Sequence, residues 1–285
     1  SADHAAVKLG QKGKIVKVTF FDFAIEDIVP FPPNYVLVVC DSGIKAQKTK
    51  NAKEQFNQLV SCYRIGFQLV KKLFPQYAPF IQHLRDINTR TLNVPLANIY
   101  KILLHLPEKI TFEELKNFFT LKEIDEILKL HQVKKKQIFP IRGVVLFGLA
   151  ECERSRKFAT LLKNKQYALI GQLMKTSHQG DRVARLSSTG ELLPFQAPTS
   201  NSYLLKLIED LESGDPERVN RAQLEWQPGC YHCSLPEIDF MVDVACQTPG
   251  VLGAQLAGAG LGGCMMVLVH KEAVEKLKQL SLIHI

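Results

Sequence analysis

The chain has 285 residues, of which 46% are hydrophobic and 22% are charged, and its formal net charge is +8 at pH 7. This length allows one large or two modest domains with a sizeable core, and the composition is that of an ordinary soluble protein. No apolar run is long enough to cross a bilayer, and the N-terminus lacks the basic and apolar regions of a signal peptide. Seven cysteines favour reduced thiols in the cytoplasm over a disulfide framework. We therefore predict a cytoplasmic protein with no membrane partner.

The basic charge is concentrated in two places, at Lys45, Lys48, Lys50 and Lys53 and at residues 134–136. Such an excess favours anionic partners, which include nucleotides, phosphosugars and nucleic acids. A solvated, lysine-rich surface is the simpler interpretation. Few aromatic residues interleave with these lysines, which argues against nucleic-acid binding.

The N-terminal segment predicts a short helix start followed by two strands. Asp3 lies where a carboxylate would be favoured by the dipole of a helix N-terminus. Residues 14–21 and 35–40 are rich in β-branched and aromatic residues, which is typical of strands, and prolines interrupt the chain between them. A turn at residues 41–43 leads into a lysine-rich loop. The helix that follows is expected to bury one face, made of Phe56, Leu59, Val60, Tyr63 and Phe67.

The middle of the chain predicts helices joined by short turns over residues 74–139. Thr111 with Glu114 and Thr120 with Glu123 both fit the capping-box pattern. A long helix is expected from Arg142 to about residue 163, and a second one over residues 166–178. His178 would stand at the C-terminal end of that second helix, where an imidazole is a favourable cap.

The following segment predicts a loop at residues 187–190 and a helix over residues 203–212. Cys230 and Cys233 have the spacing of a metal-binding knuckle, but no second pair follows them. Because a closed structural zinc site needs four ligands, we expect both to be free thiols without metal.

The C-terminal segment contains the most distinctive pattern. Ser234 is expected to cap a helix that begins at Pro236 and closes near Gly250. A strand then begins at Val251 and leads into a loop with four glycines over residues 258–263. A second strand follows over residues 265–269, and a final helix over residues 271–279. Glycines reach positive φ freely, so this loop is either a tight hairpin turn or a concavity whose amides bind an anion.

This order of elements resembles the C-terminal half of the GHMP-type small-molecule kinases, and most closely of the galactokinases. Residues 236–242, PEIDFMV, are similar to the family's PELDxLV, and residues 253–264, GAQLAGAGLGGC, to its GAxxxGAGxGGC. Residues 1–10 resemble (S/G)xxDQxxxxLG, with His4 in place of glutamine, and residues 171–178 resemble GxLMxxSH. Phe56-Asn57 and Cys62 resemble the (Y/F)NxRVxxC pattern of the N-acetylgalactosamine kinase-like branch, with Leu59 in place of arginine.

The resemblance implies an α+β fold with helices packed on an antiparallel sheet, and the helices of residues 229–279 are expected on one face of that sheet. Residues 1–40 would be the remnant of an N-terminal kinase domain, and residues 41–279 would form a GHMP-kinase C-terminal domain. Helical insertions would occupy residues 74–139 and 179–228, with a lid or an oligomer contact as possible roles of the second. Residues 280–285 do not continue the charged helix before them and are expected to be a non-native tail.

The resemblance also implies a chemistry: transfer of a phosphoryl group from ATP, with Mg²⁺, to the C1 hydroxyl of galactose or of an N-acetylgalactosamine type of sugar. Asp3 matches the family's catalytic aspartate, and no metal ligand is assigned to this chain. The loop residues expected near substrate and phosphates are Gly258, Ala259, Gly260, Gly262 and Gly263.

Two family segments, PGRxNLIGEHxDY and PxGxGLSSSAA, are not in this sequence, and they include the main phosphate cradle. We therefore expect the later part of an enzyme that is inactive alone. A non-catalytic relative that serves as a sugar- or nucleotide-responsive regulatory module is the alternative, and a basic nucleic-acid-binding protein is a third hypothesis.

Overall fold

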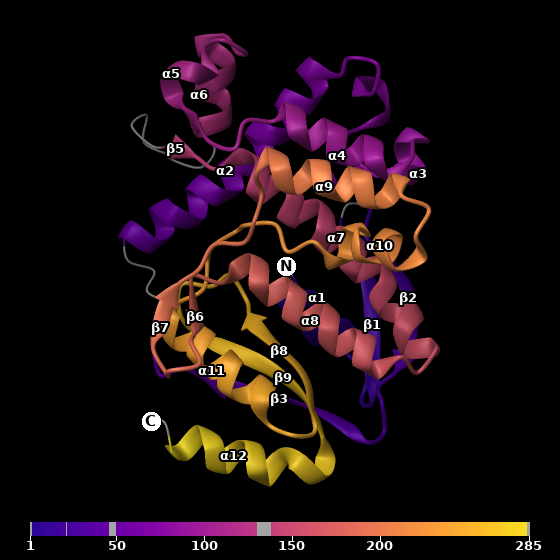
Figure 1. The fold of residues 1–285 in the computed structure, drawn as a ribbon, viewed down its shortest axis with the longest axis vertical. Coiled ribbons are helices and arrows are strands. Elements are labelled where there is room, and N and C mark those ends of the chain that lie inside the picture. Colours follow the sequence, from indigo (N-terminus) through magenta and orange to yellow (C-terminus); the bar gives the residue numbers. More distant parts are fainter. Residues whose placement is uncertain (1, 21, 46–49, 130–137, 284–285) are drawn as a thin grey trace.

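A computed structural model describes residues 2–20, 22–45, 50–129 and 138–283 (Figure 1). The α-helices are α1 (Ala2–Leu9), α2 (Lys50–Leu73), α3 (Thr89–Leu92), α4 (Leu96–His105), α5 (Phe112–Leu115), α6 (Leu121–Lys129), α7 (Ile141–Lys163), α8 (Tyr167–Asp181), α9 (Asn201–Glu212), α10 (Pro216–Arg221), α11 (Pro236–Gln247) and α12 (Val274–Ile283). The strands are β1 (Lys14–Thr19), β2 (Ala24–Pro30), β3 (Tyr35–Asp41), β4 (Ile110–Thr111), β5 (Ile138–Phe139), β6 (Ala184–Leu186), β7 (Leu192–Pro194), β8 (Val251–Ala257) and β9 (Cys264–His270).

The largest sheet has three antiparallel strands in the order β3-β9-β8. Val267 and Val269 of β9 belong to the core that contains the buried residues of α11 and α12, whereas Leu268 packs with Ile170 and Met174 of α8. The α+β architecture is confirmed. The two helices of residues 229–279, α11 and α12, share the core of Val267 and Val269 on one side of the sheet, as expected, while α8 covers the other side next to Leu268.

Helix α8 lies unusually close to β8 and runs beside it (Figure 1). A Cβ on Gly171 would lie 2.2 Å from the carbonyl oxygen of Leu252, and one on Gly253 would lie 2.2 Å from the carbonyl oxygen of Gly171. Only glycine permits this approach. Because Gly171 contacts Leu252 and His178 contacts Leu256, the C-terminal end of α8 reaches the end of β8 where the glycine loop begins.

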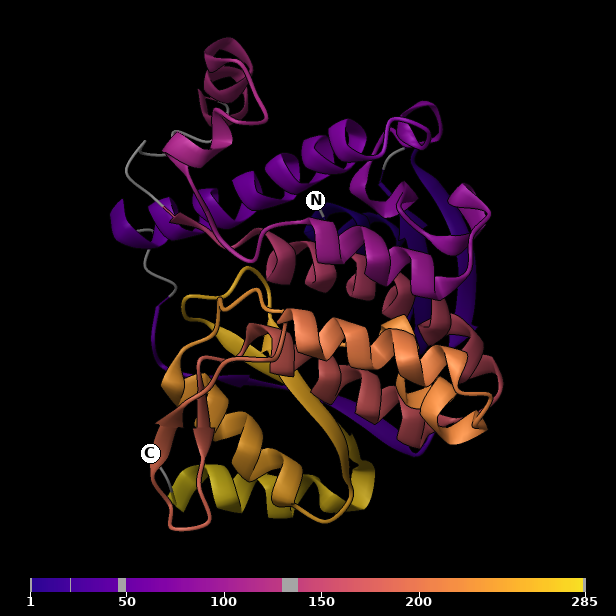
Figure 2. The same cartoon turned by 45° about the horizontal axis from the view of Figure 1, so that its top comes forward.

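A group of helices that includes α2, α4, α7 and α9 lies on the other side of the molecule from α12 (Figures 1 and 2). Within this group, α2 packs on α7 and α4 packs on α9. The buried face of α2 contains Leu59, Cys62, Ile65 and Leu69, whereas Phe56 is exposed, so the predicted face was only partly right. Gly66 lies on the same face, where a Cβ would meet a methyl group of Val145 at 2.3 Å. Close packing against α7 therefore decides which stripe of α2 is buried.

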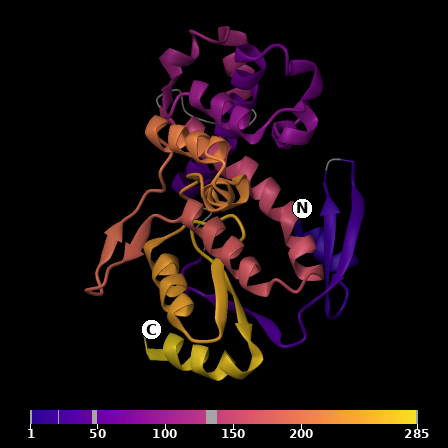
Figure 3. The ribbon, with the colours of Figure 1, turned by 45° about the vertical axis from the view of Figure 1, so that its right-hand side comes forward.

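Strands β1 and β2 form a hairpin of their own beside α7 and α8 (Figure 3). The sequence prediction included β1 but missed β2. A register shift between Lys17 and Val18 interrupts the ladder. The two-residue pairing of β4 with β5 was likewise not predicted within the helical region of residues 74–139.

Several helix ends test the capping predictions. The two capping boxes, at Thr111 with Glu114 and at Thr120 with Glu123, are both present. Ser234 does not cap α11, because Leu235 occupies that position and no side chain satisfies the free amides. Helix α12 continues to Ile283, so the expectation that the helix stops before residue 280 is wrong, while residues 284–285 lie outside the described part. Among the described helices, none is both long and apolar enough to span a bilayer.

Candidate functional site

The glycine loop at residues 258–263 joins β8 to β9, as the sequence predicted. Its four glycines have φ values of +86°, +79°, +125° and +89°, and Leu261 between them has a φ of +60°. An L-residue at such angles is strained, which explains the glycine content. The loop is therefore a distinct backbone structure rather than a two-residue turn.

Hydrogen bonds on both sides fix this loop. The amide of Leu261 donates to the carbonyl of Cys233 at 2.7 Å, and the amide of Gly263 donates to the carbonyl of Ile44 at 2.8 Å. The carbonyl of Gly263 accepts from the amide and the hydroxyl of Ser42, at 3.0 Å and 2.6 Å. The loop is thus held between the segment before α11 and the turn after β3.

The loop is open at Gly258 and Ala259, which are exposed, whereas Gly260 and Gly262 are buried. Within the described ranges, the amides of Ala259, Gly260 and Gly262 make no backbone hydrogen bond. A Cβ on Gly258 or on Gly263 would meet nothing within 4 Å. Unpaired amides at an open glycine loop suit an oxygen-rich or anionic ligand, since such groups need an acceptor.

A buried acid lies directly behind the loop. The Sγ of Cys233 is 3.2 Å from Oδ1 of Asp181, the last residue of α8. Burial raises the pKa of Asp181 to about 7, opposed by the Cys233 hydrogen bond and reinforced by the nearby charge of Glu151. Burial and the same carboxyl raise the pKa of the Cys233 thiol, so at neutral pH this cysteine is a thiol that donates to Asp181.

A second buried pair supports β8. His178 and Asp239 are both fully buried, with Nε2 of His178 3.1 Å from Oδ1 of Asp239. The Nδ1 of His178 accepts from the amide of Leu256 at 3.3 Å, which leaves Nε2 to carry the proton. Burial lowers the pKa of His178 below its ordinary value. The sequence left the role of His178 unassigned, and in the structure its side chain bridges α8, α11 and β8.

Two aspartates of α11 bind the backbone that follows α8. Oδ2 of Asp239 accepts from the amides of Val183 and Ala184, each at 2.8 Å. Burial raises the pKa of Asp239, but hydrogen bonds from His178, Ser234 and these amides together lower it below its ordinary value.

Asp243, one turn later, accepts from the amide of Leu186 at 3.0 Å and pairs with both terminal nitrogens of Arg182, at 2.7 Å and 2.6 Å. This network was not predicted from the sequence. The signal available in the sequence was the spacing of four between Asp239 and Asp243, which places both on one side of α11.

The remaining predicted residues are distributed as follows. Asp3 lies in α1, but its side chain is outside the described residues, as are the side chains of Lys48 and residues 134–136. Lys45 and Lys53 are exposed. All seven cysteines are free, and the described residues contain no cluster of three or more potential metal ligands. The predictions for Asp3 and for a metal-free Cys230–Cys233 pair stay predictions.

Comparisons with known proteins identify what this arrangement is similar to. Residues 207–279 match the family model described as GHMP kinases C terminal. A galactokinase of Thermotoga neapolitana is 38% identical over 82 residues, which cover 28% of this chain and 23% of that protein. A galactokinase of Roseiflexus sp. is 24% identical over 250 residues, which cover 88% of this chain and 41% of that protein.

This chain therefore spans about two fifths of the Roseiflexus relative's length and a smaller share of the other. A crystal structure of Lactococcus lactis galactokinase complexed with galactose aligns with 89% of this chain and 42% of that one, at 14% identity and a TM-score of 0.45.

Proposed function

Because the chain carries a galactokinase-like GHMP kinase C-terminal domain, we propose that it serves a sugar kinase that transfers the γ-phosphoryl group of ATP to the C1 hydroxyl of galactose or a related monosaccharide. The observation that carries the proposal is the glycine loop over residues 258–263, with its unpaired amides and its positive φ angles. Such amides stabilise negative charge without a rearrangement during the reaction.

The loop fits a nucleotide or sugar ligand by two features. Its open side at Gly258 and Gly263 leaves room for ligand atoms, and the hydrogen bonds of Leu261 and Gly263 hold it in shape. ATP would supply the phosphoryl group, and Mg²⁺ would neutralise the charge of its phosphates. The amides of Ala259, Gly260 and Gly262 would orient the oxygens nearest to them. No ion ligand is assigned to the described residues.

Asp3 would act as the general base. A sugar hydroxyl is a poor nucleophile until its proton is removed, and a positioned carboxylate accelerates such a step by roughly 10²–10⁴. Asp3 would accept that proton and hold it away from the reacting oxygen. This assignment depends on the motif match of residues 1–10.

We extend the proposal to the organisation of the chain. Residues 41–279 would form the C-terminal domain with insertions at residues 74–139 and 179–228, and residues 1–40 would belong to the N-terminal domain. The pairing of β3 with β9 brings residues 35–41 into the sheet of the C-terminal domain, so we move the proposed division from residues 40 and 41 to a point before β3.

The test is a coupled assay of ADP release with galactose and N-acetylgalactosamine. It uses this chain alone and a hybrid in which the PGRxNLIGEHxDY and PxGxGLSSSAA segments of a galactokinase precede Ser1. We expect sugar-dependent turnover by the hybrid and none by the chain alone, because phosphoryl transfer fails without a phosphate cradle. A well-folded hybrid that binds sugar without turnover would favour the non-catalytic alternative, and turnover by the chain alone would mean that the active site is elsewhere.

A further inference from the structure

The turn at residues 41–44, which follows β3, is bonded to the end of the glycine loop in both directions. The amide and the hydroxyl of Ser42 donate to the carbonyl of Gly263, at 3.0 Å and 2.6 Å. The amide of Gly263 donates back to the carbonyl of Ile44 at 2.8 Å. One turn therefore fixes both peptide groups of Gly263, and the three partners come from two segments more than 200 residues apart in the chain.

Short-range hydrogen bonds hold this turn in shape. The Oδ1 of Asp41, the last residue of β3, accepts from the amide of Gly43 at 3.0 Å, and the Oγ of Ser42 accepts from the amide of Ile44 at 3.2 Å. Side chains of aspartate and serine commonly stabilise turns in this way. Because the single hydrogen of the Ser42 hydroxyl is donated to Gly263, this hydroxyl acts on the loop and cannot donate to a ligand.

The amide of Gly262 lies between two bonded neighbours. The amide of Leu261 donates to the carbonyl of Cys233, and that of Gly263 donates to the carbonyl of Ile44. Gly262 is buried, yet its own amide makes no hydrogen bond to any residue that the structure describes. A buried amide without an acceptor costs free energy, so a ligand oxygen is the partner that this amide needs. The space beside it is open, since a Cβ on Gly263 would meet nothing within 4 Å.

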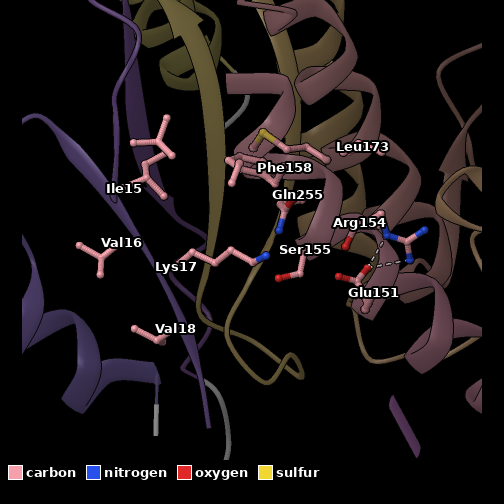
Figure 4. A pocket seen from close by; sticks show the side chains of 14 residues that line it. Ile15, Val16, Lys17, Val18, Glu151, Arg154, Ser155, Phe158, Leu173 and Gln255 are labelled. Atoms are coloured by element: carbon pink, nitrogen blue, oxygen red, sulfur yellow. Dashed lines mark hydrogen bonds and ion pairs between the residues drawn. The ribbon is translucent and has the colours of Figure 1, made fainter. Parts of the chain in front are cut away.

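The start of the loop is held less firmly than its end. Gly258 and Ala259 are exposed, and neither makes a hydrogen bond with the described residues outside the strands. Just before them, the side chain of Gln255 borders a cavity of about 320 Å³ between the β1–β2 hairpin and helices α7 and α8 (Figure 4). The conformation of the loop therefore depends on the hydrogen bonds of Leu261 and Gly263.

We propose that Ser42 is a positioning residue of the glycine loop, which holds the amide of Gly262 as a donor to an anionic oxygen of the ligand. The inference rests on the proposed function, in which the loop stabilises the negative charge of a phosphoryl group. Ser42 acts through Gly263 and does not touch the ligand. Without its hydroxyl, Gly263 loses one donor and the amide of Ile44 loses its acceptor, so the turn no longer holds the Ile44 carbonyl firmly against the loop.

The experiment is a titration of the full chain with sulfate, followed by the ¹H–¹⁵N NMR signals of the loop amides. Sulfate stays a dianion at neutral pH and is not a phosphoryl donor, so its binding does not depend on turnover. We expect a saturable shift of the Gly262 signal in the wild type. The affinity should be about tenfold weaker in Ser42→Ala, the loss of one or two neutral hydrogen bonds, and within about twofold of the wild type in Ser42→Thr, which keeps the hydroxyl.

Hydrogen exchange gives a readout that a general loss of stability would not produce. In Ser42→Ala the amide of Gly263 should exchange about tenfold faster, whereas the amide of Leu261 keeps its protection because its acceptor is Cys233. Urea unfolding of each variant shows that it is folded under the conditions of the titration.

Two control variants separate positioning from stability. Thr248 is buried before the start of β8, the strand whose other end leads into the loop, and its hydroxyl donates to the carbonyl of Val244 at 3.3 Å. Thr248→Ala loses a comparable hydrogen bond, so it should lower stability and leave the sulfate affinity unchanged. Ser188→Ala, at an exposed serine between β6 and β7, should change neither quantity.

Equal sulfate affinities of Ser42→Ala and the wild type would overturn the inference and leave the proposed kinase function standing, because the loop would then bind an anion without Ser42. A loss of affinity in Thr248→Ala as large as that in Ser42→Ala would also overturn it, since general stability would explain both. If the wild type shows no saturable shift, the inference fails together with the anion-binding role of the loop on which the proposed function rests.

Discussion

Cys233 connects the buried carboxyl of Asp181 to the glycine loop through its two ends. Its Sγ lies 3.2 Å from Oδ1 of Asp181, while its carbonyl accepts from the amide of Leu261 at 2.7 Å. The carbonyl of Asp181 in turn accepts from the amide of Ser234 at 2.9 Å. Hydrogen bonds thus connect the end of α8, the segment before α11 and the loop. A substitution in either of the first two is expected to alter the conformation of the loop.

The first prediction concerns the pH dependence of stability at Asp181. Its folded-state pKa is about 7, above the value of about 3.9 in an unfolded chain. The folded protein therefore keeps a proton between these values that the unfolded chain has lost. The stability from this group is complete below about pH 4 and is lost as the pH rises through about 7, by at most about 4 kcal/mol.

Asp181→Asn removes this titration. In urea unfolding between pH 4 and 8, the stability of the variant relative to the wild type should rise with pH. The difference between the two curves cancels the contribution of titrating groups that do not interact with Asp181. A difference that stays flat over this range would contradict the pKa of Asp181.

The second prediction concerns Asp239, which is fully buried and binds His178 and two backbone amides. Asp239→Asn removes the charge and leaves at least one of these donors without an acceptor. We expect a loss of about 3 kcal/mol or more in the free energy of unfolding, the cost of breaking a buried charged network. Glu237→Gln, an exposed change in the first turn of the same helix, should cost less than about 1 kcal/mol. Equal effects of both changes would mean that the network contributes little.

The glycine hairpin could be predicted from sequence because its signals are local. Strand alternation, four glycines in six residues and the flanking helices all lie within one stretch. The same holds for the capping boxes of Thr111 and Thr120, in which partners are three residues apart. The coverage of both faces of the sheet could not be predicted in this way, because α8 is far from β8 in the chain.

The buried polar contacts next to the loop, between Asp181 and Cys233 and between His178 and Leu256, could not be predicted from the sequence either. Asp181 and Cys233 are 52 residues apart, and His178 and Leu256 are 78 residues apart. The sequence could not assign a role to His178, since it could not show that β8 and α11 enclose that position. The prediction of the buried face of α2 was only partly right for a related reason. The contact with α7 at Gly66 decides which side of α2 is buried, and the apolar periodicity of α2 alone does not show it.

The third prediction separates steric conflict from backbone strain in the loop. A Cβ on Gly260 would lie 2.2 Å from the carbonyl oxygen of Cys233, whereas one on Gly258 would meet nothing within 4 Å. Both glycines have positive φ, +79° and +86°, so alanine is strained at each. We expect Gly258→Ala to cost about 1–2 kcal/mol and Gly260→Ala to cost clearly more, because its strain adds to a clash.

Hydrogen exchange gives the corresponding local readout. The amide of Leu261 should lose protection in Gly260→Ala, since its acceptor is the same Cys233 carbonyl, and should keep it in Gly258→Ala. Equal protection in both variants would show that the loop does not depend on its contact with Cys233.

The fourth prediction concerns the thiols of Cys230 and Cys233. Both are buried, and burial raises the pKa of each, which disfavours the thiolate that a metal needs. We expect no stoichiometric zinc by elemental analysis of the purified protein, and slow reaction of both thiols with a disulfide reagent until the protein is unfolded. Zinc at one equivalent that is lost in Cys230→Ser would contradict this.

The last prediction tests the assignment of Asp3 in the hybrid that carries the PGRxNLIGEHxDY and PxGxGLSSSAA segments before Ser1. Asp3→Asn keeps the size of the side chain and removes its ability to accept a proton. Turnover should therefore fall by roughly a hundredfold or more, the loss expected for a positioned base, while the affinity for nucleotide stays nearly unchanged. Nucleotide affinity is measured by equilibrium binding, so that a folding defect is seen as a joint loss of both quantities. Asp22→Asn, at an exposed residue between β1 and β2, is the matched control and should leave turnover within twofold, as roughly expected for a surface change of small energetic effect. Turnover that survives Asp3→Asn would make Asp3 an ordinary helix-start carboxylate, favoured by the dipole of α1 rather than by catalysis.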